Sequence, residues 1–236
     1  MMNLAPILAG IAVAGLIYQA AAVPAPFKVE AIPHQAEGEP YTAMAAQVGK
    51  DMLASLIPYR VFKNGGVTYY LGDKDTPPLQ VWAQEKLTGL TIFKVDAARI
   101  HDGQAVVTPS GLLKRGDKLA FASSRNETTL GIYVGMEHSI GDTSFPLRLV
   151  RAQFPKLAAP PIGQPCYDAE NRLVGIVLGV SRKGTCHLLP AQAISFLAAH
   201  PEAKRVRLGC LLDINASTPV IEGLINGGPL ARGGIQ

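Results

Sequence analysis

The dominant pattern along the chain is a series of short apolar runs separated by turns rich in Gly, Asp and Asn. Runs of this length, rich in β-branched and aromatic residues, predict strands. They cover residues 67–71, 79–82, 90–95, 118–122, 128–134, 147–152, 172–180, 185–189 and 205–210. Many short strands at this spacing predict an all-β barrel or sandwich.

Two segments carry apolar residues at helical spacing instead. Ala45–Ile57 has them on one helical face, and Pro58 follows where such a helix would end. A second helix is predicted from Pro190 to about His200. Pro24–Pro40 has no clear periodicity and predicts a linker. Residues 28–58 are therefore expected to form a linker and a helix.

The N-terminal segment is the longest uncharged stretch of the chain, since Lys28 is the first charged residue. Its apolar run from Leu4 to Val23 matches either a signal peptide or a hydrophobic helix that anchors the protein in a membrane. Ala20–Ala22 offers small residues for a signal peptidase. Both alternatives, over residues 1–27, predict a periplasmic or otherwise extracytoplasmic protein, and the second places the anchor in the inner membrane.

Composition and charge exclude several classes of protein. Hydrophobic residues are 48% of the chain, which excludes a disordered protein. The net charge of +4, without a basic stripe, gives no support for nucleic-acid binding. Three cysteines do not make a disulfide framework, and no His/Cys cluster has metal-ligand spacing. We therefore expect no metal, no cofactor and no nucleic-acid partner.

Four stretches, in order, resemble trypsin-like serine proteases of the HtrA/Deg type, in which a PDZ domain follows the protease. They are Val67–Lys74 with Gly89–Asp96, Lys114–Phe121, the set Thr129–Gly135 with Pro161–Cys166 and Asn171–Ile176, and Leu189–Ile194. Val206–Cys210 and Asn226–Ile235 resemble the beginning of a PDZ domain. The resemblance covers about 170 residues, from Val67 to Gln236.

The resemblance implies a mainly β fold, a trypsin-like double β-barrel whose first barrel is curtailed, over residues 59–200. An N-terminal hydrophobic helix would precede it, and a partial PDZ-like segment, 201–236, would follow. Arg207, Leu208, Gly209 and Cys210 match the PDZ loop that presents backbone N–H groups to a peptide carboxylate. An ordinary strand beginning is the alternative for this loop.

The same resemblance implies that the catalytic groups are missing. A serine protease needs a nucleophilic hydroxyl, a His base and a carboxylate that orients the His. The matching positions are Ile162, Tyr59 and Gly89, and none supplies the required group. The position that would provide an oxyanion-hole N–H is Pro160, which has none.

These substitutions predict a catalytically inactive, HtrA-like pseudoprotease that is exported or anchored in a membrane. It would bind proteins or peptides, serve as a scaffold, or be a subunit of a larger membrane complex. The alternative is an active serine- or cysteine-type peptidase with relocated residues, such as Cys166 with His187. Cys186 and His187 are not expected to act as a pair, because adjacent residues of a strand face opposite sides.

Overall fold

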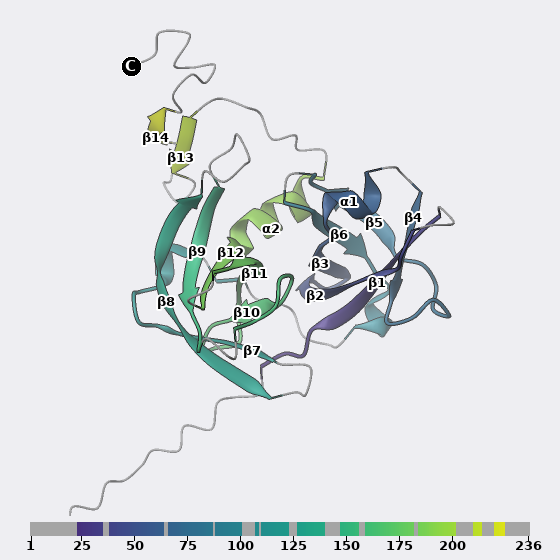
Figure 1. Cartoon of the computed structure of the whole chain (residues 1–236), viewed down its shortest axis with the longest axis horizontal. Helices are drawn as coiled ribbons and strands as arrows, with labels where there is room; N and C mark the ends of the chain where they lie inside the picture. Colours follow the sequence, from purple (N-terminus) through teal and green to yellow (C-terminus); the bar gives the residue numbers. More distant parts are fainter. Residues whose placement is uncertain are drawn as a thin grey trace, which may run out of the picture.

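The computed structural model describes residues 23–34, 38–63, 66–86, 88–100, 107–108, 110–122, 127–139, 147–155, 159–181, 184–201, 210–213 and 220–224. Two β units lie side by side with helix α2 between them (Figure 1). The fold is mainly β, as the sequence predicted. No helix within the described part of the chain is long and apolar enough to cross a membrane. The expected N-terminal helix falls largely on residues 1–22, outside the described ranges.

The first unit is a six-stranded antiparallel sheet in the order β4-β1-β2-β3-β6-β5. Its strands are β1 (Phe27–Pro33), β2 (Tyr41–Gly49), β3 (Met52–Leu56), β4 (Val67–Leu71), β5 (Gln80–Gln84) and β6 (Leu90–Lys94), with the short helices α1 (Tyr59–Phe62) and η1 (Ala97–Arg99). The sheet curls, because Leu79 N, just before β5, donates to Tyr69 O of the opposite outer strand at 2.7 Å.

This first sheet corrects one sequence prediction. The expected linker and helix over residues 28–58 are wrong, since those residues form β1, β2 and β3. The first barrel therefore has six strands. It is curtailed because the sheet does not close into a full barrel, and not because strands are missing. The first sheet begins at Phe27, before residue 59. Strand β3 is central and buried on both faces, which explains why all of its residues except Ser55 are apolar.

The second unit is a closed six-stranded barrel in the order β10-β11-β12-β9-β8-β7. It consists of β7 (Lys118–Ala122), β8 (Thr128–Ser139), β9 (Leu147–Gln153), β10 (Pro165–Tyr167), β11 (Leu173–Val180) and β12 (Thr185–Pro190), preceded by η2 (Ser110–Leu112). Helix α2 (Ala191–Ala199) follows, as predicted. Strands β13 (Cys210–Asp213) and β14 (Val220–Leu224) form a separate hairpin.

Three buried clusters explain this arrangement. One fills the first sheet, including Leu53 and Phe93, and another fills the closed barrel, including Leu119 and Phe154. The third joins both units, since it contains Ile92 of β6, Ile176 of β11 and Ile194 of α2. Trp82 of β5 also donates its Nε1–H to Ala198 O of α2 at 2.8 Å. The junction between the units is therefore a packed core.

Candidate functional site

Tyr59 lies at the start of α1, directly after β3 and Pro58. Its side chain is 46% exposed, and its ring meets the Phe62 ring edge-on at a centroid distance of 5.4 Å. Pro58 fits before a helix because it fixes an extended backbone there, with φ −56° and ψ 138°. The residue that the sequence matched to the catalytic His thus stands on an exposed helical turn at the end of a buried strand.

Gly89 lies against the backbone that leads into Tyr59. Ile57 N donates to Gly89 O at 2.8 Å. Gly89 has φ +76°, and a Cβ atom placed on it would stand 2.1 Å from Ile57 O. Real Cβ atoms do not approach an oxygen so closely, so no side chain fits here without backbone movement. The position matched to the orienting carboxylate is therefore closed to any carboxylate in this backbone.

Ile162 lies in the loop that precedes β10, and its side chain is 59% exposed. The loop is held to β11, because Gly163 N donates to Val177 O at 2.7 Å and Val177 N donates to Gln164 O at 3.0 Å. A Cβ atom on Gly163 would lie 4.0 Å from Met44 N of β2. The loop therefore stands on the side of the closed barrel that faces the first sheet.

A chain of contacts connects Met44 to the other two positions. Ser55 of β3 is fully buried and donates its hydroxyl to Met44 O at 2.7 Å. Strand β3 then leads through Ile57 to the Gly89 contact and to Tyr59. The structure thus places Gly89 against Ile57, two residues before Tyr59, and it places the Ile162 loop beside the neighbouring strand of the same sheet.

None of the three matched positions carries the group that acyl transfer would require there. An aliphatic side chain at 162 has no nucleophilic atom, and Pro160 has no N–H for an oxyanion. Buried Gln164 follows the loop and donates its Nε2–H to Ala122 O at 2.9 Å, so its amide is engaged in the barrel. No three His, Cys, Asp or Glu side chains within the described ranges gather as metal ligands.

The alternative pair of Cys166 and His187 is contradicted by the structure. Cys166 is fully buried inside the closed barrel. Burial raises the pKa of its thiol well above the ordinary value, and nearby Cys186 raises it further. His187 instead directs Nε2 to Glu137 Oε2 at 3.3 Å, in contact with solvent. A buried thiol whose pKa is raised is not a nucleophile, and the His187 ring is turned to Glu137.

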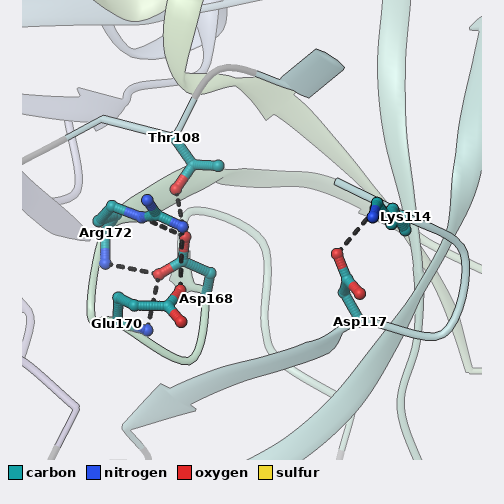
Figure 2. Close-up of polar contacts among 6 residues, drawn as sticks. All are labelled: Thr108, Lys114, Asp117, Asp168, Glu170 and Arg172. Atoms are coloured by element: carbon teal, nitrogen blue, oxygen red, sulfur yellow. Dashed lines mark hydrogen bonds and ion pairs between the residues drawn. The ribbon is translucent and has the colours of Figure 1, made fainter. Parts of the chain in front are cut away.

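A buried carboxylate that the sequence analysis missed lies at the opposite end of β10. Asp168 accepts hydrogen bonds from Thr108 Oγ1 at 2.5 Å, from Arg172 Nε at 2.7 Å and from two backbone N–H groups (Figure 2). Asn171 in the same turn has φ +58°. The turn residues Asp168–Arg172 were a detectable signal, whereas the distant partner Thr108 was not.

This cluster is structural. The Asp168 carboxylate satisfies the β10–β11 turn and ties it to the strand-like segment at Thr108, whose N–H donates to Leu173 O at 2.8 Å. Both carboxylate oxygens of Asp168 accept hydrogen bonds from groups of this chain, so neither is directed at a ligand. The predicted peptide-binding residues Arg207, Leu208 and Gly209 lie outside the described residues, and Cys210 begins β13.

Comparisons with known proteins agree with this architecture. The HtrA-type protease AlgW, solved with a tripeptide, superposes with a TM-score of 0.60 at 16% identity, covering 89% of this chain and 76% of that one. The Rv3671c protease from M. tuberculosis, in its active form, gives 0.56 at 15% identity, covering 78% and 83%. The chain has the trypsin-like fold of HtrA-type proteases. No family model and no curated protein matches its sequence.

Proposed function

We propose that this chain is a catalytically inactive, HtrA-like protein that binds extended polypeptide segments on the exposed surface around Tyr59 and Ile162, beside the packed junction of its two β units. The observation that carries the proposal is Gly89, where the backbone leaves 2.1 Å between a would-be Cβ and Ile57 O. A missing residue can be replaced by a neighbour, but a position without room for a side chain cannot host an orienting carboxylate.

The exposed apolar side chains at the triad positions support the binding role. Tyr59 and Ile162 expose 46% and 59% of their surfaces, although both lie next to packed strands. Val180, at the end of β11, is a further exposed apolar residue. An extended segment could add to the end of this strand while its side chains contact the two triad-position residues.

Incubation of the purified chain with unfolded casein tests the first half of the proposal. We expect no cleavage products, and the same result from an Ile162→Ala variant. Cleavage by the native chain that is lost in Ile162→Ala would show that the loop is catalytic and that the proposal is wrong.

Binding of a library of fluorescent unfolded peptides tests the second half. Ile162→Glu should lower the affinity for the captured peptides about tenfold, because the new carboxylate would lose its water when a peptide binds. Leu130→Glu is the matched control, since Leu130 is an exposed aliphatic residue on the outer side of β8. Equal binding by the two variants would contradict a site at the Ile162 loop.

We also propose an extracytoplasmic location, with residues 1–27 as a cleaved signal or a retained anchor, and a partner protein in a membrane complex. The uncharged sequence of that segment supports the location. Purification in mild detergent tests the association, because a partner should co-elute with the chain. An isolated monomer of the anchored chain would argue against the complex.

A further inference from the structure

The outer side of the closed barrel carries a group of exposed aliphatic side chains that the peptide-binding proposal does not use. Leu112 of η2 is 63% exposed, and Leu130 and Ile132 of β8 are also exposed. Leu130 and Ile132 are two residues apart on one strand, so they share a face. Exposed aliphatic residues on one strand face, with Leu112 just before the turn that leads into β7, indicate an interaction surface.

Basic side chains border this apolar group. Lys118 of β7 lies directly opposite Ile132 in the strand register, and therefore on the same face. Lys114 and Arg115 occupy the exposed turn before β7. This turn is fixed beside β8, because Gly116 N donates to Tyr133 O at 2.9 Å and Tyr133 N donates to Asp117 O at 2.8 Å.

The carboxylate of Asp117 in this turn is engaged by a hydrogen bond within the turn itself. Asp117 Oδ2 accepts the Lys114 backbone N–H at 2.7 Å (Figure 2). The three basic residues and this one acidic residue give the surface a net charge of 3 − 1 = +2. We name Leu112, Lys114, Arg115, Lys118, Leu130 and Ile132 the β7–β8 surface.

The N-terminal end of the described chain enters the fold near this surface. Val23 packs into the buried cluster that also contains Ala120 and Ala122 of β7. Ala120 shares a strand face with Lys118. The segment before β1 runs toward β7 (Figure 1). The described chain therefore begins at a residue that packs in the same buried cluster as β7.

From these observations we propose that the β7–β8 surface rests on an anionic lipid bilayer. Aliphatic residues surrounded by Lys and Arg suit the interface of such a bilayer, where each basic residue is worth about a fivefold gain in affinity. The apolar sequence 4–23 is long enough to enter the same bilayer, and Val23 at its end packs in the cluster that contains Ala120 and Ala122 of β7. The charge and the chain connection together favour lipid over a protein partner.

The test places an environment-sensitive fluorophore at residue 112 of the full chain. Leu112→Cys is made together with Cys210→Ser, and buried Cys166 and Cys186 should not take the label. The chain is incorporated into vesicles of phosphatidylcholine, with or without phosphatidylglycerol. We expect a blue shift with the anionic lipid, and its loss after Lys114→Glu with Arg115→Glu.

Phe196→Cys supplies the matched control, because Phe196 is 59% exposed on α2. Its label should give the same spectrum in both vesicles. Charge reversal at Lys63 and Lys74 of the first unit should leave the Leu112 signal unchanged. Identical Leu112 spectra with and without phosphatidylglycerol would overturn the proposal. A concentration-dependent shift without lipid would assign the surface to a second copy of the chain instead.

Discussion

At the scale of single residues, Gly89 sets the strongest limit on chemistry. Gly89→Asp adds the carboxylate that the fold family would require at this position. It should destabilise the protein by about 2–5 kcal/mol, because a positive φ disfavours a side chain and the new Cβ meets Ile57 O. Urea denaturation of the purified variant measures this loss.

Gly72→Ala is the control for the conformational part of that cost. Gly72 has φ +84°, but a Cβ atom there would meet nothing within 4 Å. Its replacement should cost only about 1–2 kcal/mol. A Gly89→Asp variant no less stable than Gly72→Ala would show that the Ile57 backbone moves to admit the carboxylate.

The buried thiols give the fold a sensitivity to alkaline pH. Burial raises the pKa of Cys186 to about 11 from an ordinary 9.0, and the pKa of Cys166 is also raised. Because the folded state holds the neutral thiols, their contribution is complete below pH 9 and is lost as pH rises toward 11. The urea midpoint should therefore fall over this interval, and less steeply in Cys186→Ala. A midpoint that stays constant between pH 9 and 11 would contradict the prediction.

At the scale of elements, the β2–β3 hairpin shows where sequence patterns fail. Ala-rich residues 45–57 satisfy helical spacing, yet they form two strands joined at Lys50–Asp51. Burial of β3 between β2 and β6 outweighs the helix propensity of its residues. The turn residues Gly49–Asp51 were a signal for the hairpin, whereas the neighbours of β3 could not be seen in the sequence. Five strands of the closed barrel were predictable because each is a short apolar run between turns, whereas the three-residue strand β10 was not among the predicted runs.

The β10–β11 turn depends on a single carboxylate. Asp168→Ala should destabilise the protein by about 2–4 kcal/mol, because the buried Thr108 hydroxyl and two backbone N–H groups lose their acceptor. Differential scanning calorimetry measures the change. Glu170→Ala is the control, since Glu170 is exposed and contacts only Arg172 among the cluster's side chains. Loss of such an exposed ion pair should lower the stability by only about 0–1 kcal/mol. Similar losses in both variants would mean that Asp168 does not organise the turn.

At the scale of the whole molecule, the fold was more predictable than the site. The order of the motifs from Val67 to Ile194 predicted a trypsin-like double barrel, and the architecture agrees. The chemistry of Tyr59 and Ile162 could be stated from residue identity alone. The lack of room for a side chain at Gly89 could not be predicted from the sequence. It is caused by Ile57 O, which lies in the segment that follows β3 and is distant from Gly89 in the sequence. Glycine in the sequence shows only that a side chain is missing, and the backbone shows that none fits.

That difference leads to a prediction for an attempted restoration of catalysis. A triple variant, Tyr59→His, Gly89→Asp and Ile162→Ser, places the three residue types of a Ser-His-Asp triad at the matched positions. It should remain without measurable casein hydrolysis, because Asp at 89 displaces the backbone before Tyr59 and Pro160 still lacks an oxyanion donor. A single missing donor typically lowers the rate about 10²–10³-fold. Adding Pro160→Gly tests the two causes separately. Activity in that quadruple variant but not in the triple one would assign the defect to Pro160, whereas activity in the triple variant would show that the junction is still built for catalysis.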